Sequence, residues 1–151
     1  MKRNSIIGLG LTACAVLLAG CGEVQDTRPG QPVAHRRAAF SEILRTFEPM
    51  GVMLRDDRYD PEKFNALAAS FATKVEAPWL YFQPDTNYPP TKARAEVWSQ
   101  AGRFTAARAA FLQAQRDLST AAASGNEAKV RAAYRAVEDQ CRKCHEVFKL
   151  K

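Results

Sequence analysis

The C-terminal half of the chain carries a long apolar repeat that constrains the fold more than any other feature. Apolar residues recur there at alternating spacings of three and four residues in two successive segments. This spacing places the side chains on one stripe of an α-helix and is typical of helices packed in a bundle. Ser124-Gly125-Asn126 separates the segments, with a glycine suited to end one helix and an asparagine suited to cap the next. The sequence therefore predicts a helical hairpin, whose stripes are Phe104, Ala107, Phe111, Ala114, Leu118 and Ala121, then Val130, Tyr134, Val137, Cys141, Cys144 and Phe148.

Two further helices are predicted upstream. One apolar face includes Phe40 and Phe47, and we expect it to end near Pro49, because proline breaks a helix interior. Asp60-Pro61 reads as an N-cap followed by a proline at the first helical position, and apolar residues then continue to Pro78. Residues 78–91 hold four prolines and predict a long connection. Short, long and short connections between four helices describe an all-α antiparallel four-helix bundle, which we expect over residues 34–151. The upstream apolar residues are Phe40, Ile43, Leu44 and Phe47, then Phe64, Leu67, Phe71 and Val75.

The first twenty residues read as an export signal. A basic start at Lys2 and Arg3 precedes an apolar stretch over residues 6–18, which is too short to span a bilayer. Leu18-Ala19-Gly20-Cys21 resembles the bacterial lipoprotein box, in which the cysteine becomes a lipidated N-terminus. The alternative is cleavage by the general signal peptidase, which would leave Cys21 as an ordinary thiol.

Lipidation of Cys21 would anchor the protein to a membrane on its periplasmic side, since several acyl chains bind firmly where one is marginal. Gly22 stands where an aspartate would favour retention at the inner membrane in enterobacterial sorting, so we expect the outer membrane. Residues 21–33 contain two prolines and little to bury, and we expect them to form a flexible tether.

The charge pattern gives no sign of a nucleic-acid partner. The formal net charge is +6, and removal of residues 1–20 with their two basic side chains lowers it to +4. No run of lysine and arginine is longer than a pair, so the basic residues predict a solvated surface.

Of the four cysteines, only Cys141 and Cys144 remain after the leader and Cys21 are set aside. They stand in the string Cys141-Arg142-Lys143-Cys144-His145, and C-x-x-C-H is the attachment signature of c-type haem. On a helix, residues 141, 144 and 145 share one face, so two thiols and an imidazole reach the same haem. Three alternatives are a thiol–disulfide exchange pair, which needs a helix N-terminus, a zinc site, which needs four ligands, and a structural disulfide, which would close a very small loop.

The chain resembles the cytochrome c′ family over roughly residues 34–151. Besides the haem motif, the resemblance rests on Pro78-Trp79, Thr91-x-Ala93, Glu96-Val97-Trp98, Phe104, Leu118-x-x-Ala121-Ala122 before Gly125, and Phe148-Lys149. It implies one covalently bound haem c on the C-terminal helix, attached at Cys141 and Cys144, with His145 as the proximal iron ligand. It also places Phe40 over the distal face, Arg36 beside a haem propionate and Lys149 at the border of the proximal pocket.

The resemblance implies two functions from different classes. With Phe40 over the iron and no sixth ligand, the protein would bind nitric oxide or carbon monoxide, as a sensor, carrier or scavenger. With Met50, Met53 or His35 as the sixth ligand, it would be a one-electron carrier for redox partner proteins. Family members commonly pair through their first two helices, which suggests a homodimer, although no feature of this sequence establishes one. No acid–base pair or nucleophile accompanies the haem motif, so we do not predict an enzyme.

Overall fold

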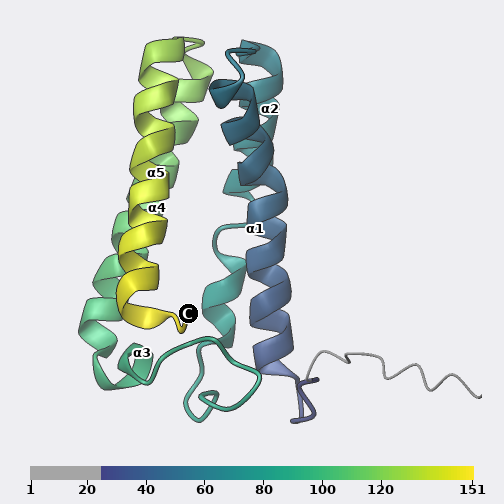
Figure 1. The fold of residues 1–151 in the computed structure, drawn as a ribbon, viewed down its shortest axis with the longest axis vertical. Coiled ribbons are helices and arrows are strands. Elements are labelled where there is room, and N and C mark those ends of the chain that lie inside the picture. Colours follow the sequence, from purple (N-terminus) through teal and green to yellow (C-terminus); the bar gives the residue numbers. More distant parts are fainter. Residues whose placement is uncertain (1–24) are drawn as a thin grey trace, which may run out of the picture.

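The computed structural model describes residues 25–151, and these form a bundle of four principal helices (Figure 1). The helices are α1 (Pro32–Arg55), α2 (Pro61–Ala72), α4 (Ala101–Ala123) and α5 (Glu127–Phe148), with a short 3-10 helix η1 (Ala77–Tyr81) and a short α3 (Glu96–Ser99). Within this range the only β-type pairing is one isolated bridge between Ala93 and Lys149. The prediction of an all-α four-helix bundle is confirmed. The export signal and Cys21 lie outside the described residues.

Two predicted helix starts and one predicted turn are confirmed by their local geometry. The Asp60 side chain accepts a hydrogen bond from the backbone N–H of Lys63 at 3.1 Å, and Asn126 accepts one from Lys129 at 3.0 Å. Both bonds satisfy N–H groups that the first turn of a helix leaves unpaired. Gly125 has a φ of 64°, the left-handed conformation that lets the chain leave α4 and enter α5 after three residues.

Helix α1 runs past the point where the sequence predicted its end. Pro49 lies inside the helix, which continues to Arg55. Pro49 is exposed, and so is Arg45, whose carbonyl loses its helical partner, while Met50, Gly51 and Leu54 are buried beyond them. Burial of these residues outweighs the lost hydrogen bond. Leu44, expected on the buried face, is 49% exposed.

Helix α2 is shorter than predicted and ends at Ala72 instead of continuing to Pro78. The Thr73 hydroxyl donates to the Ser70 carbonyl at 2.7 Å, and the Thr73 N–H donates to the same carbonyl at 3.2 Å. These bonds to residue i−3 tighten the last turn and end the α-helix. Val75 remains buried although it lies beyond the helix.

The predicted tether over residues 21–33 is wrong in its C-terminal part. Asp26 is only 3% exposed and Val33 is fully buried, and α1 already begins at Pro32. The Asp26 carboxylate accepts hydrogen bonds from the backbone N–H groups of Val33 and Ala34, which fastens this segment to the start of α1. A buried, hydrogen-bonded carboxylate belongs to the folded domain rather than to a tether.

The buried apolar cluster lies where α1, α2, α4 and α5 meet, towards the end of the bundle that carries the two short turns. Phe47 of α1 stacks on Tyr134 of α5 with 4.4 Å between ring centroids, and Phe71 of α2 contacts Phe47 and Phe111. Among residues 25–151, no helix is long and apolar enough to span a membrane. The opposite end of the bundle is covered by the long connection, α3 and the C-terminal residues (Figure 1).

Candidate haem site

The haem motif lies in the last turns of α5. Cys141 and Cys144 are partly buried, and His145 is exposed. Burial, with a smaller contribution from Cys144, raises the pKa of the Cys141 thiol to about 11, and burial also raises the pKa of Cys144. Both thiols are therefore protonated at neutral pH, which is the reverse of what thiol–disulfide exchange requires. Their place near a helix C-terminus, where the dipole disfavours an anion, points the same way.

The zinc alternative lacks ligands in the described range. No group of three His, Cys, Asp or Glu side chains within residues 25–151 is placed to hold a metal ion. His35, the only other histidine, lies at the start of α1, where its ring stacks on Tyr81 with 5.3 Å between centroids. Cys141 and Cys144 are not joined by a disulfide. Together with His145 they provide two thiols and one imidazole on a single helix, which is fewer than the four ligands of a structural zinc site.

The surroundings of His145 favour its neutral form. Partial desolvation, and then the Lys149 cation one turn later, lower the pKa of the imidazole below its usual value. A neutral imidazole has the free lone pair that iron ligation requires. Lys149 is exposed, and its backbone N–H donates to the His145 carbonyl at 3.2 Å. Lys149 therefore lies one turn after His145 at the end of α5.

The register of α1 against α5 brings Phe40 to the level of His145. The two helices are antiparallel, since Arg131 near the start of α5 donates to the carbonyl of Leu54 near the end of α1 at 2.6 Å. Gly51 faces Tyr134, because a methyl group on Gly51 would lie 2.2 Å from the Tyr134 hydroxyl oxygen. Phe40 precedes Gly51 by eleven residues, and His145 follows Tyr134 by eleven, so the two residues lie at the same height to within about one helical turn. We call this level the haem-motif end and the level of Gly51 and Tyr134 the turn end.

Aromatic side chains form one wall at the haem-motif end. The Phe40 ring contacts Trp79 and Phe82, and Phe104 contacts Phe82 and Phe148, with centroid distances of 4.9–6.3 Å. The Trp79 indole N–H is buried and has no hydrogen-bond partner. Two thiols and an imidazole on one helix, at the same end of the bundle as an apolar aromatic wall with one unpaired donor, fit a flat, largely apolar macrocycle such as haem c. The sequence singled out Phe104 and Phe148 through the apolar stripes and Trp79 only through the family resemblance, and Phe82 was missed.

The methionines lie far from this level. Met50 is fully buried in the core beside Gly51, and the Met53 sulfur accepts a hydrogen bond from the Asp60 N–H at 3.4 Å. Met50 lies ten residues beyond Phe40 on an unbroken helix, which corresponds to about 15 Å. Both methionines therefore belong to the turn end.

Arg36 is buried and bound to the long connection. Its two terminal nitrogens donate to the Tyr81 carbonyl, to the hydroxyl and carbonyl of Thr86 and to the Thr91 hydroxyl, at 2.7–3.3 Å. Its guanidinium also lies 4.5 Å from the centre of the Phe82 ring. The resemblance implied that Arg36 contacts a haem propionate. For that contact, its guanidinium would have to give up some of these hydrogen bonds to the connection. In this structure Arg36 instead holds the connection against α1 and supports the aromatic wall.

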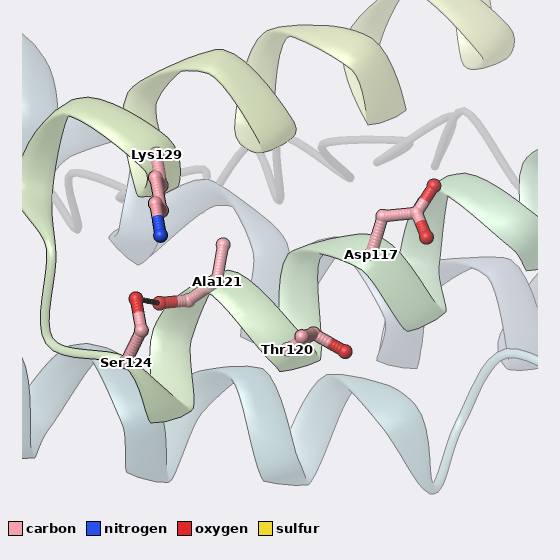
Figure 2. A pocket seen from close by; sticks show the side chains of 5 residues that line it. All are labelled: Asp117, Thr120, Ala121, Ser124 and Lys129. Atoms are coloured by element: carbon pink, nitrogen blue, oxygen red, sulfur yellow. Dashed lines mark hydrogen bonds between the residues drawn. The ribbon is translucent and has the colours of Figure 1, made fainter.

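Two hollows in the described part of the chain bear on the choice of site. One, of about 270 Å³, lies beside the aromatic wall and is lined by residues that include Trp79, Trp98 and Arg108. Figure 2 shows the other, of about 280 Å³, beside the turn between α4 and α5, where the Ser124 hydroxyl donates to the Ala121 carbonyl. Neither contains Cys141, Cys144, His145 or Phe40.

Comparison with known proteins identifies relatives over nearly all of the described chain. The profile of the family described as Cytochrome C′ matches residues 31–149. A cytochrome c′ from Alcaligenes xylosoxydans xylosoxydans is 30% identical over 128 residues, which are 84% of this chain and 99% of the relative.

Solved structures agree with this match. A variant of cytochrome c′ from Alcaligenes xylosoxidans in complex with nitric oxide has a TM-score of 0.77 and 30% identity, and the similarity covers 83% of this chain and 98% of the other. A carbon monoxide-bound variant from the same organism has a TM-score of 0.77 and 30% identity over 84% of this chain and all of the other. The similar proteins thus share both the fold and the chain length of the described domain.

Proposed function

The chain belongs to the cytochrome c′ family, with haem c as its cofactor, and we propose that its iron is five-coordinate and binds nitric oxide and carbon monoxide. The observation that best supports this proposal is the register of α1 against α5, by which Phe40 and His145 lie at a similar level of the bundle. An aromatic ring cannot ligate iron, so Phe40 at this position occludes the distal face without filling the sixth site. The nitric oxide and carbon monoxide complexes of similar proteins support the same ligand class.

The chain's own residues would each have a defined part in this function. Cys141 and Cys144 hold the haem through thioether bonds, and His145 supplies the neutral imidazole. The iron supplies the gas-binding and one-electron chemistry. Phe40 restricts access from the α1 side, and Trp79 and Phe82 hold the Phe40 ring in place. We propose a role in nitric oxide scavenging or sensing rather than substrate turnover.

The electron-carrier alternative would need a sixth ligand from this chain. Met50 and Met53 lie at the turn end, about 15 Å or more from Phe40 along α1, and His35 stacks on Tyr81. These positions argue against a low-spin, six-coordinate iron.

An optical spectrum of the purified holoprotein tests the proposal. We expect a high-spin ferrous band that shifts strongly when carbon monoxide is added, and an identical spectrum for Met50→Leu. Sharp low-spin bands that carbon monoxide leaves unchanged would contradict five-coordination. Loss of those bands in Met50→Leu or Met53→Leu would then identify the ligand.

We also propose that Cys21 is lipidated and tethers the domain to a membrane, facing the periplasm, with the outer membrane favoured. The tether would raise the local concentration of the protein near membrane-bound partners, including redox proteins. Cys21→Ser should release the protein from the membrane fraction, and retention of this variant would contradict the anchor.

A further inference from the structure

The N-terminal segment of the domain is fastened at the same end of the bundle as the haem motif. The buried Asp26 carboxylate accepts hydrogen bonds from the Val33 N–H at 2.8 Å and from the Tyr88 hydroxyl at 2.9 Å. The Arg28 guanidinium lies 3.9 Å from the centre of the Tyr88 ring and donates to the Asp85 carbonyl. We call Asp26, Arg28 and Tyr88 the N-terminal clip. It joins the chain before α1 to the long connection that covers the haem-motif end (Figure 1).

The clip fixes how far Cys21 can lie from the domain. Five residue steps separate Cys21 from Asp26, and a fully extended chain of this length spans about 18 Å. Without the clip the first fixed residue would be Pro32, eleven steps from Cys21, and the span would grow to about 40 Å. An anchor at Cys21 is therefore confined to the neighbourhood of the haem-motif end.

Exposed lysines gather at this end. Lys92 and Lys149 are brought together because the Leu150 N–H donates to the Lys92 carbonyl at 2.8 Å and Ala93 bridges to Lys149. Lys151 follows, and Arg28 is also exposed. The exposed carboxylates nearby are Asp85 in the connection and Glu146 on α5, and the latter lies 3.8 Å from Arg142.

The opposite end of the bundle has a balanced charge. Its cations, Arg55, Arg58, Lys63, Lys129 and Arg131, are matched in number by the carboxylates of Asp56, Asp57, Asp60, Glu62 and Glu127. Ion pairs join Arg58 with Asp56, Lys63 with Asp60, and Arg131 with Asp57 and Glu127. Cations therefore exceed carboxylates at only one end of the bundle. This asymmetry of charge would direct that end towards an anionic surface.

We propose that the haem-motif end of the bundle lies against an anionic lipid surface, held there by the short link from the N-terminal clip to Cys21. This orientation rests on the lipid anchor proposed above. Each basic side chain near an anionic leaflet contributes about fivefold to membrane association, so four such side chains reinforce the effect of the link. The bundle axis would then point away from the membrane, and the turn end of the bundle would be the end farther from the lipid.

Amine labelling of the full-length holoprotein on vesicles tests this orientation. The protein is bound to vesicles of phosphatidylethanolamine and phosphatidylglycerol and treated with a reagent that modifies lysine but does not cross lipid. Modification of each lysine is read by peptide mass spectrometry. Lys92, Lys149 and Lys151 should react about fivefold more slowly than in the soluble Cys21→Ser protein. Lys63 and Lys129, at the opposite end, are the internal controls and should react equally in both.

Opening the clip should abolish the protection. In Asp26→Ala combined with Tyr88→Phe, the longer link should raise the reactivity of Lys92, Lys149 and Lys151 towards that of the soluble protein. Asp117→Ala, which truncates an exposed carboxylate on α4 outside the clip, is the matched control and should keep the protection. Retained protection after the clip is opened would contradict its role in the orientation.

The remaining outcomes separate the anchor from the orientation. If the intact mass shows no acyl group on Cys21, both the anchor and the orientation are wrong. If the acyl group is present but lysines at both ends react alike, only the orientation is wrong. Protection that appears without vesicles and grows with protein concentration would assign this surface to a second copy of the chain and would overturn the lipid proposal.

Discussion

Helices α1 and α5 pack against each other in two different ways along their length. At the turn end the contact is direct, since Phe47 stacks on Tyr134 and no atom could be added to Gly51. At the haem-motif end Phe40 instead contacts Trp79 and Phe82 from η1 and the residue after it, and His145 is exposed. One pair of helices therefore supplies a close contact at one level and, at the other, the two residues that we propose on either face of the haem. If the proposal is right, stability and ligand access are controlled about 16 Å apart on the same helices.

The most severe test of the comparison removes the haem attachment itself. The variant with both Cys141→Ala and Cys144→Ala should lose all haem on a denaturing gel stained for haem, because no thioether remains. The bundle should stay helical by circular dichroism, since the turn end does not depend on these thiols. Haem that stays with the denatured chain would contradict the assigned attachment.

The next test overpacks the turn end. Gly51→Ala places a methyl group against the Tyr134 ring and should lower the free energy of unfolding by about 1–3 kcal/mol in chemical denaturation. Gly102→Ala is the matched control, because nothing lies within 4 Å of its added carbon, and it should stabilise by about 0.5–1 kcal/mol. Carbon monoxide binding should be unchanged in both. Equal stability of the two variants would contradict the direct contact.

The converse test opens the haem-motif end. Phe40→Ala should accelerate carbon monoxide association about tenfold, which corresponds to about 1.4 kcal/mol of activation free energy. Stopped-flow mixing measures this rate, and Val52→Ala, an exposed apolar residue of α1 near the turn end, is the control. An unchanged rate in Phe40→Ala would place the barrier elsewhere.

The smallest effect concerns Asp26 and depends on pH. Burial alone would raise the pKa of this carboxyl, but hydrogen bonds from Ala34, Tyr88, Arg28 and Val33 outweigh it and lower the pKa. Because the folded pKa lies below the unfolded value, the carboxylate stabilises the fold above about pH 4, and this contribution is lost as the pH falls through the folded pKa. Asp26→Ala should therefore melt below the parent protein at pH 7, and the gap should close in strong acid. A gap that is independent of pH would contradict this assignment.

The parts of the fold that depend on local chemistry were predictable from the sequence. Asp60 and Asn126 cap the helices that follow them, and Gly125 adopts the left-handed turn, because each depends only on neighbouring residues. The ends of α1 and α2 were not predictable in this way. Pro49 is tolerated because distant residues bury Met50 and Leu54, and that tertiary contribution does not appear in a local pattern.

The candidate site likewise has parts that the sequence predicts and parts that it does not. The haem motif is predicted from its spacing, and the distal position proposed for Phe40 comes from the family resemblance. The aromatic wall and the N-terminal clip do not, because Phe82 and Tyr88 lie in a connection without periodicity. Asp26 lies six residues before α1, too far upstream for the usual capping position, so its role becomes visible only when the chain folds back.

The three-residue turn between α4 and α5 has a consequence for the order of assembly. A short loop costs little closure entropy, and contacts that are local in sequence form fast. We therefore expect the C-terminal hairpin, which carries both thiols and the imidazole, to form before α1 docks on it. In that order the chain would present its attachment site while the site is still open, and Phe40 would arrive last and close it.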